Sequence, residues 1–189
     1  MPNWAWGQVR ITGTKENVLA FSKRFITQDK EEDIRVLPGV KFFGRSFYDY
    51  TRNALEDEIR SKFPESAEAE EATVEIMIDF AWSATSCLIS NYPLHSPECI
   101  SLADACKEDH VDVVLQTQEP GMCFEEHISC DRNGNLEQNE SDMPTGKCRH
   151  CGYTESIAST EDPSEYECSE CGEVGFDIIS AEEACQNGT

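Results

Sequence analysis

Four cysteines in the C-terminal part of the chain have the spacing of a metal site. Cys148 and Cys151 are two residues apart, as are Cys168 and Cys171, and a glycine follows each pair. The two pairs are separated by 16 residues, which is within the range of sites with four thiolate ligands. A two-residue gap lets both sulfurs of one turn reach a tetrahedral ion at about 2.3 Å. The sequence therefore predicts one structural Zn(2+), held in a zinc ribbon by these four cysteines.

The predicted zinc site has no open position. Four thiolates complete the tetrahedral shell, so no water can bind the ion and a catalytic role is not expected. A redox-active Cys-x-x-Cys motif and a pair of disulfides are the alternatives, and two matching knuckles with glycine in the tight turn favour zinc over both. His150, between the first two ligands, is expected to point outward, and Cys185 is expected to be a free thiol.

Acidic residues crowd the predicted ribbon, while its basic residues are Lys147 and Arg149. A protein that contacts phosphates needs cations to displace the bound counterions, so direct nucleic-acid binding by the ribbon is not expected. A structural role or contact with another protein is favoured instead. The carboxylates predicted to contact a partner are Glu155, Glu161, Asp162, Glu165, Glu167, Glu170 and Glu173.

No catalytic motif is evident elsewhere in the sequence. There is no HExxH motif, no glycine-rich phosphate loop and no Gly-x-Ser-x-Gly elbow. Cys123, Glu125 and His127 alternate along a predicted strand and would share one face, but such triples arise often by chance. His95 and His110 belong to other predicted elements. The protein is therefore predicted not to be an enzyme.

The charge of the 189-residue chain is unevenly distributed. Residues 1–60 carry ten Lys or Arg and nine Asp or Glu, a net charge of +1, whereas residues 61–189 carry five and 28, a net charge of −23. Such a field repels polyanions and attracts basic protein surfaces. The alternative explanation is that the negative charge only keeps the protein soluble. With no apolar run of the length that spans a membrane, no signal peptide and cysteines outside a disulfide framework, a soluble protein in the cytoplasm is expected.

The pattern of apolar residues predicts an α+β domain over residues 1–136. Trp4, Trp6, Val9 and Ile11 indicate a strand, in which the tryptophans are interpreted as core residues and, as the alternative, as a platform for stacking bases. The other predicted elements are a helix from the cap Thr14 to Phe25, a helix over 46–63, a strand over 73–82, a helix from Ser96 to about Asp109, and strands over 111–118 and 122–131. This order is typical of an antiparallel sheet with helices on one face.

Three further segments complete the predicted organisation. Residues 137–146 are polar, contain Pro144 and Gly146, and are expected to be an interdomain linker. The zinc ribbon is predicted over 147–179, and a tail over 180–189. In the first domain, the stretch 41–52 mixes basic and aromatic residues, which either fill the core or stack on bases. The structural interpretation of that stretch is favoured.

Several short motifs occur together in an order that resembles one known family. They are Met-Pro-Asn-Trp at the N-terminus, the strand, turn and helix to Phe21, Phe80-Ala81-Trp82-Ser83, and Glu119-Pro120-Gly121. In these features residues 1–136 resemble the YubB-like family of phage and plasmid proteins. The resemblance implies a ferredoxin-like fold and a mobile-element origin, with no catalytic residues to carry over. The segment 42–63 departs from the family's Pro-rich stretch, and the ribbon is an addition.

These observations lead to two functional hypotheses. The first is a non-enzymatic phage or mobile-element protein that binds a host or element-encoded protein with a basic surface. In its sharpest form it mimics the charge of DNA and inhibits a restriction or CRISPR-type defence nuclease. The alternative is a nucleic-acid-binding accessory protein that uses the nearly neutral N-terminal half, with Arg45 and Arg52 in a basic patch.

Overall fold

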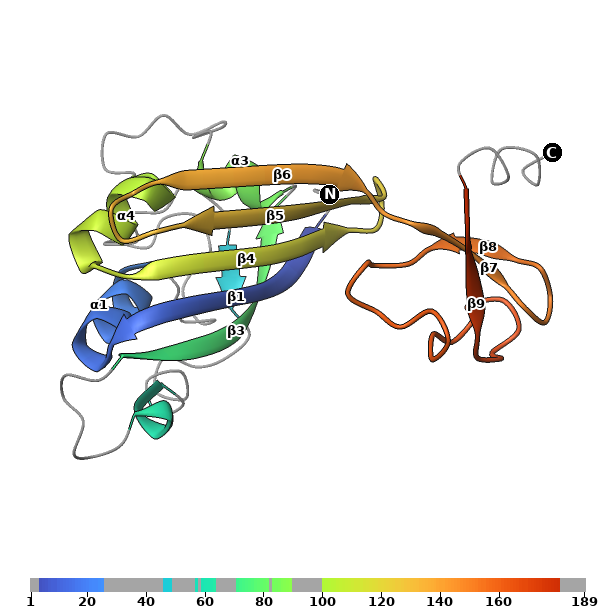
Figure 1. Ribbon diagram of the computed structural model, residues 1–189, viewed down its shortest axis with the longest axis horizontal. Helices are drawn as coiled ribbons and strands as arrows, with labels where there is room; N and C mark the ends of the chain where they lie inside the picture. Colours follow the sequence, from blue (N-terminus) through green and yellow to red (C-terminus); the bar gives the residue numbers. More distant parts are fainter. Residues whose placement is uncertain are drawn as a thin grey trace. The chain divides into compact units, whose positions relative to one another are not determined.

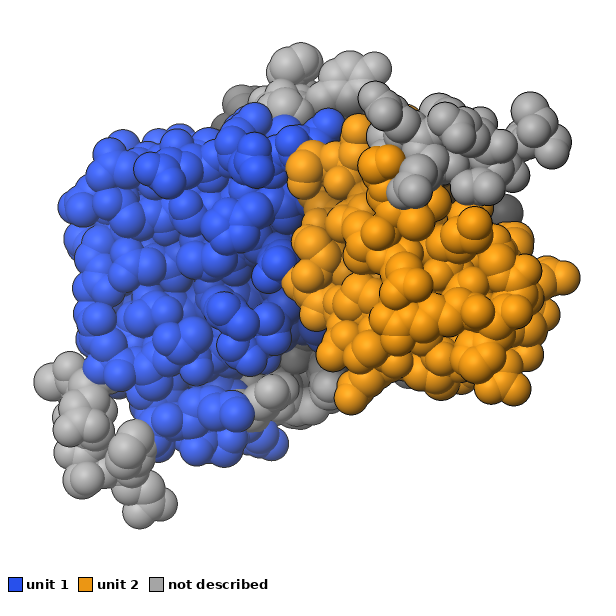
Figure 2. Space-filling model, turned by 45° about the vertical axis from the view of Figure 1, so that its right-hand side comes forward, with its two compact units in different colours: residues 1–119, 126–140 blue, residues 120–125, 141–189 orange. Residues whose placement is uncertain are grey.

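A computed structural model covers the chain and describes residues 4–25, 46–48, 57, 59–63, 71–81, 83–89 and 100–180. The chain divides into two compact units, which Figure 2 distinguishes by colour. The first unit, called the sheet domain below, contains residues 1–119 and 126–140. The second, called the ribbon unit, contains residues 120–125 and 141–189. In the described part of the chain, no helix has the length and apolarity needed to cross a membrane.

The sheet domain is built on a six-stranded sheet with helices between its strands (Figure 1). The strands lie in the order β2-β3-β1-β4-β5-β6, and β1 pairs antiparallel with both β3 and β4. Helix α1 follows β1, and helices α3 and α4 lie in the chain between β3 and β4. The bounds are β1 Trp4–Thr14, α1 Lys15–Phe25, β2 Ser46–Tyr48, β3 Glu71–Ala81, α3 Ala84–Leu88, α4 Leu102–Asp109, β4 Asp112–Glu119, β5 Phe124–Cys130 and β6 Leu136–Asp142.

Alternating burial along the central strands places the core on one face of the sheet. In β1, Val9 and Ile11 are buried, and in β3, Val74 and Ile76 are buried, while the residues between them are largely exposed. Side chains of a strand alternate between its two faces, so these residues point to one side. They belong to the same apolar cluster as buried residues of the helices, among them Val18, Phe21, Leu88, Leu102 and Ala105. An α+β domain with an antiparallel sheet is therefore confirmed.

Gly7 permits the close pairing of β1 with β4. A Cβ atom at this position would lie 2.0 Å from the backbone oxygen of Gln116 and 2.6 Å from the Cα of Thr117. Both are backbone atoms, which cannot move aside without separating the two strands. Any side chain at this position would therefore disturb the middle of the sheet.

The helix ends follow the capping preferences of the sequence. Thr14 Oγ1 accepts a hydrogen bond from the Asn17 N–H at 3.4 Å, as its predicted role as the cap of α1 requires. Helix α4 is capped by Ser101, whose Oγ accepts from the Asp104 N–H at 3.1 Å. It ends at His110, which adopts a left-handed conformation with φ 52°. The expected start of this helix at Ser96 lies outside the described residues, and the described cap is five residues later.

The predicted burial of the first two tryptophans is wrong. Trp4 and Trp6 are 40% and 39% exposed, because they occupy the alternate phase of β1 from the buried Val9 and Ile11. Even and odd positions of a strand point to opposite faces, so both pairs could not lie in one core. The strand itself was predicted correctly.

Two segments have a different secondary structure from the one expected. Residues 46–48 form the short strand β2, which pairs with β3, so the helix predicted over 46–63 does not begin at Ser46. Residues 59–62 are helical, with Ile59 and Phe63 buried. The expected linker 137–146 instead supplies most of β6 and the start of β7. Its polar composition is explained by the edge position of β6, where every residue from Glu137 to Asp142 is exposed.

The ribbon unit contains a separate three-stranded sheet in the order β8-β7-β9. Strand β7 (Thr145–Cys148) lies in the centre and pairs antiparallel with β8 (Thr154–Ser156) and β9 (Phe176–Ile179). Its small core contains Ile157 and Phe176, with Tyr166 packed against it. The rings of Tyr166 and Phe176 meet edge to face at 5.4 Å. Gly146 makes room for this packing, because a Cβ there would lie 2.3 Å from Ile157 Cδ1.

Candidate metal centre

The first cysteine knuckle leads from β7 into β8. The Cys148 N–H donates to the carbonyl oxygen of Tyr153 at 2.7 Å, and the Gly152 N–H donates back to the carbonyl of Cys148 at 3.0 Å. Gly152 adopts φ +76°, a left-handed conformation that other residues reach only with strain. The His150 N–H points at the Cys148 sulfur at 3.4 Å. This turn thus places the backbone N–H of His150 beside the Cys148 sulfur.

The second knuckle has the same backbone hydrogen bonds. The Cys168 N–H donates to the Glu173 carbonyl at 2.9 Å, and the Gly172 N–H donates to the Cys168 carbonyl at 2.9 Å. Gly172 has φ +72°, again left-handed. A bridge between Glu167 and Val174 closes the base of this turn. The glycine after each Cys-x-x-Cys is therefore required by the turn itself.

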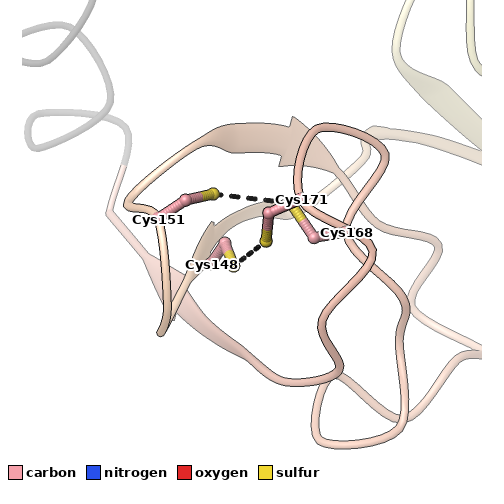
Figure 3. Close-up of side chains that lie close together, drawn as sticks. All are labelled: Cys148, Cys151, Cys168 and Cys171. Carbon is pink, nitrogen blue, oxygen red and sulfur yellow. Dashed lines mark hydrogen bonds between the residues drawn. The ribbon is translucent and has the colours of Figure 1, made fainter.

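The two knuckles bring the four thiols together, as Figure 3 shows. The Cys148 and Cys171 sulfurs are 3.8 Å apart, and those of Cys151 and Cys168 are 3.7 Å apart. All four sulfur atoms lie within 4.8 Å of one another. A tetrahedral ion with metal–sulfur bonds of about 2.3 Å holds its ligands about 3.8 Å apart. The group can therefore hold one metal ion, and its donor set is consistent with structural zinc.

The electrostatics of the site also suit a cation. The backbone N–H of Cys151, followed by that of His150, lowers the pKa of the Cys148 thiol to about 6. The backbone N–H of Glu173 acts in the same direction on Cys171, but burial and hydrogen bonds with the other three sulfurs raise the pKa of that thiol to about 12. One thiolate forms readily, and further thiolates so close to it are disfavoured by charge repulsion. A bound divalent cation removes this conflict.

The acidic residues predicted to bind a partner are largely exposed around the site. Glu161, Glu165 and Glu170 are exposed, and Glu155 is half-buried. Some carboxylates have local structural roles: Asp162 accepts hydrogen bonds from Ser164, and Glu155 accepts one from the Ser169 N–H at 3.2 Å. The remaining predicted residues, Glu167 and Glu173, are exposed as well.

The basic residues of the ribbon lie close to its first knuckle. Arg149 Nε forms an ion pair with Asp177 at 2.9 Å. Lys147 is the register partner of Asp177 across β7 and β9. His150 is exposed, as expected for a residue that points away from the sulfurs. Both basic residues, Lys147 and Arg149, thus lie beside Asp177 of the ribbon's own sheet.

The structure does not place Cys123, Glu125 and His127 on one strand face, as their alternation in the sequence had suggested. Cys123 lies in the turn before β5, with φ 57°, and its sulfur donates to the Pro120 carbonyl at 3.4 Å. Glu125 accepts hydrogen bonds from the N–H and hydroxyl of Ser159. His127 is exposed on β5. The alternation along the sequence failed because the strand begins at Phe124. His95 lies outside the described residues, and His110 ends α4.

Glu126 is a buried carboxylate whose structural role was not predicted from the sequence. It is 2% exposed, and its carboxylate accepts hydrogen bonds from the Ala84 N–H at 2.7 Å, the Thr85 N–H at 3.0 Å and the Thr117 hydroxyl at 3.1 Å. Its hydrogen bonds therefore connect β5 to the start of α3. Its position in the buried phase of β5, with Ile128 and Cys130, was the available signal.

Arg132 forms a second polar connection in the sheet domain. Its guanidinium pairs with Asp112 at 2.6 Å and with Glu71 at 2.5 Å, and its backbone N–H donates to Asp112 at 2.8 Å. These contacts hold the pKa of both carboxyl groups below their usual values. The turn before β6 is thereby joined to the ends of β3 and β4.

The chain was compared with known proteins by sequence and by structure. No protein-family model matches it, and no curated protein or solved structure does so. The evidence for its function therefore comes from its own sequence and structure.

Proposed function

We propose that the four-cysteine group binds one structural Zn(2+) and that residues 147–179 form a zinc ribbon. The spacing of the sulfurs, 3.7 and 3.8 Å in two pairs, supports this, since four thiolates at these distances suit a tetrahedral ion. The metal would supply a fixed crosslink between the two knuckles. Metal analysis of purified protein tests the proposal: one zinc per chain is expected, and less than about half a zinc in Cys168→Ser.

We also propose that the sheet domain belongs to the ferredoxin-like class suggested by its resemblance to YubB-like proteins. The order β2-β3-β1-β4 supports this, together with α1 after β1 and α4 before β4. These elements give the sequence βαββαβ of that class. Strands β5 and β6 extend the sheet beyond it. An experimental structure with a different strand order would contradict the assignment.

The function that the surface supports best is binding of a basic protein partner, without catalysis, by a phage or other mobile-element protein. The observation that carries this proposal is the exposure of six of the seven predicted ribbon carboxylates, in the same unit as the four-thiol group. Between residues 141 and 180, nine Asp or Glu face two Lys or Arg. A field of this sign steers basic surfaces toward the protein and disfavours nucleic acid.

In its sharpest form, the proposal is that the protein mimics DNA charge and blocks a restriction or CRISPR-type nuclease. Two purified nucleases, one of each kind, provide the test. DNA cleavage by the sensitive enzyme should fall as the protein is added, and duplex DNA should compete with the protein for the enzyme. Binding should weaken steeply with salt, because exposed charges are screened. Tight binding that duplex DNA does not displace would contradict mimicry, while no binding to any basic protein would contradict the whole proposal.

A matched pair of variants locates the binding charges. The first replaces three ribbon carboxylates, in Glu161→Gln, Glu165→Gln and Glu170→Gln. The control removes the same charge from the sheet domain, in Glu16→Gln, Glu137→Gln and Glu140→Gln, all of which are exposed residues. Only the ribbon variant should lose binding by tenfold or more. Equal losses in both would show that net charge alone attracts the partner.

The alternative function, a nucleic-acid-binding accessory protein, is favoured by one observation. Trp4 and Trp6 are exposed on β1, where aromatic rings can stack on bases. The expected basic patch at Arg45 and Arg52 lies outside the described residues. Salt-sensitive binding to single-stranded DNA or RNA in a gel-shift series would support this alternative, and its absence at low salt would remove it.

A further inference from the structure

The four thiols of the ribbon unit lie close enough to react with one another as well as to hold a metal. The Cys148 sulfur is 3.8 Å from that of Cys171, and the Cys151 sulfur is 3.7 Å from that of Cys168. Each of these pairs joins one knuckle to the other, and they are called the cross-knuckle pairs below. Their members are 23 and 17 residues apart in the chain. The pairing is therefore a product of folding and not of the Cys-x-x-Cys spacing.

Each cross-knuckle pair combines one exposed and one buried thiol. Cys151 and Cys171, the second cysteines of their knuckles, are exposed, whereas Cys148 and Cys168 are each 2% exposed. A dissolved oxidant can reach the exposed member, and the buried member lies beside it on the other knuckle. A thiol that reacts with an oxidant next to a second thiol that resolves the product is the arrangement of a redox-sensitive site.

The other cysteines in the described part of the chain lack this combination. Cys87, Cys106 and Cys130 are buried in the apolar cluster of the sheet domain, and cysteines in such surroundings are inert. Cys123 is exposed, but its sulfur donates to the Pro120 carbonyl and does not belong to the four-thiol group. Oxidation to a disulfide is therefore expected first in the ribbon.

We propose that the ribbon is a peroxide-sensitive modification site in which the disulfides Cys148–Cys171 and Cys151–Cys168 form across the two knuckles. Hydrogen peroxide oxidises the exposed thiol to a sulfenic acid and is itself reduced to water. The buried thiol of the same pair then attacks the sulfenic sulfur, which forms the S–S bond and releases a second water molecule. The two thiols give up two electrons and two protons, so one peroxide is consumed for each disulfide.

This inference rests on the proposed zinc site and adds a form of regulation to it. A disulfide sulfur is no longer a thiolate, so the two bonds together remove the ligands of the metal and release it. They also connect the same two knuckles that the metal would connect, and small units can be held by disulfides in place of a metal. Oxidation should therefore release the metal and leave the ribbon folded, whereas chelation of the reduced chain should unfold it.

Pairing within each knuckle is the competing outcome. Disulfides between Cys148 and Cys151, and between Cys168 and Cys171, would close loops of a few residues and leave the two knuckles unconnected. In an unfolded chain, loop length alone favours these short loops by about tenfold or more. We expect the folded ribbon to reverse this preference, because it holds the cross-knuckle sulfurs at 3.7 and 3.8 Å.

The test oxidises the full zinc-loaded chain with hydrogen peroxide and maps the disulfides by mass spectrometry. Free thiols are alkylated, and the chain is cut with trypsin, which cleaves after Arg149, and with a glutamate-specific protease, which cleaves after Glu155 and Glu170. These cuts place each of the four cysteines in a separate peptide, so every pairing gives a different linked product. Cross-knuckle links should exceed links within a knuckle at least about tenfold, because proximity favours them.

Two further measurements use the same sample. A zinc-sensitive dye should detect about one zinc released for every two peroxide molecules consumed. Amide exchange should show retained protection of β7 and β9 in the oxidised chain, and loss of that protection in the reduced chain after chelation. The buried thiols Cys87, Cys106 and Cys130 should remain reduced, which shows that the sheet domain stays folded during the treatment.

Two controls separate the effect of folding from that of sequence spacing. The same chain oxidised in urea with a chelator should form mainly the disulfides within each knuckle, as loop length predicts. Cys123→Ser removes the exposed thiol outside the four-thiol group. It should change neither the pairing nor the release of zinc.

Several outcomes would overturn the inference. They are disulfides mainly within the knuckles of the folded chain, oxidation of the ribbon thiols to sulfinic or sulfonic acids without disulfides, loss of ribbon protection together with the metal, or retention of zinc at a peroxide concentration that fully oxidises a cysteine peptide. If zinc binds but the cross-knuckle bonds do not form, this inference is wrong and the zinc site stands. If the purified chain contains no zinc, the zinc site fails by its own metal analysis, and the disulfide map still decides the pairing.

Discussion

The sheet domain and the ribbon unit are held together in different ways. In the sheet domain, 22 described residues form one buried apolar cluster. In the ribbon unit, the corresponding cluster contains four buried residues, and two of them are the thiols Cys148 and Cys168. Units of a few tens of residues rarely bury enough apolar surface to fold without a metal or a disulfide. We therefore expect the sheet domain to depend on apolar packing, and the ribbon unit to depend on a metal ion bound by its four thiols.

The largest expected effect is loss of the ribbon when the metal is removed. Structural zinc contributes about 10–16 kcal/mol in small metal-dependent modules, far more than the four-residue core can replace. A strong chelator, or Cys168→Ser, should therefore unfold residues 145–179 and leave the sheet domain folded. Amide hydrogen exchange followed residue by residue measures both regions at once.

Cys123→Ser is the control for that experiment, since this exposed thiol lies outside the four-sulfur group. It should leave exchange in the ribbon unchanged. Persistent protection of the ribbon strands after chelation would break the comparison, because the small core would then suffice.

The next largest effect should come from Glu126→Ala in the sheet domain. The substitution leaves the amides of Ala84 and Thr85 and the Thr117 hydroxyl without their buried acceptor. Losing such an acceptor should lower the free energy of unfolding of this domain by about 2–4 kcal/mol. Urea unfolding, followed by a signal from the sheet domain, measures the change, and Glu137→Ala on the exposed strand β6 should have little effect. A fall below about 0.5 kcal/mol would mean that water replaces the carboxylate.

Gly7→Ala should destabilise the same domain by a smaller amount. The added methyl group would lie 2.0 Å from the Gln116 backbone oxygen, so β1 and β4 must separate locally, at a cost of about 1–3 kcal/mol. Thermal unfolding should show a lower midpoint for the sheet domain and an unchanged ribbon. Gly152→Ala is the complementary variant, since its strain from φ +76° falls on the ribbon. An equal effect of each variant on both regions would show that the two units do not unfold independently.

The smallest effect concerns acid sensitivity. Hydrogen bonds from the backbone and side chain of Asn135 lower the pKa of Asp131 to about 2, against about 3.9 in unfolded chains. A lowered pKa in the folded state stabilises the turn fully above about pH 4, and this contribution is lost as the pH falls toward 2. The protection of the Asn133 and Asn135 amides, measured against the intrinsic exchange rate at each pH, should therefore fall between pH 4 and pH 2.

The ribbon should respond to acid at a higher pH than this turn. Metal binding needs deprotonated thiols, and the Cys148 thiol already has a pKa of about 6. Protons should therefore compete for the sulfurs before Asp131 titrates. Asp131→Ala should remove the pH dependence of the turn alone. If the turn is lost before the ribbon, the assigned order of acid sensitivity is wrong.

The sequence alone determined which four thiols form the candidate metal centre. The two Cys-x-x-Cys-Gly segments fix which thiols can meet, because each knuckle is a local turn whose geometry depends on a few adjacent residues. The strands β3 and β4 were also predictable, because their apolar residues alternate with a period of two. The acidic character of the ribbon follows directly from its composition.

Only the tertiary structure decided which strand faces are buried and which polar groups meet. Trp4 and Trp6 look like core residues by type, yet the opposite phase of β1 faces the helices. Strand β6 looks like a linker because an edge strand can be polar on both faces. Glu126 finds its three donors 9, 41 and 42 residues away along the chain. Contacts over such separations depend on the packing of whole elements, which no local pattern of residues records.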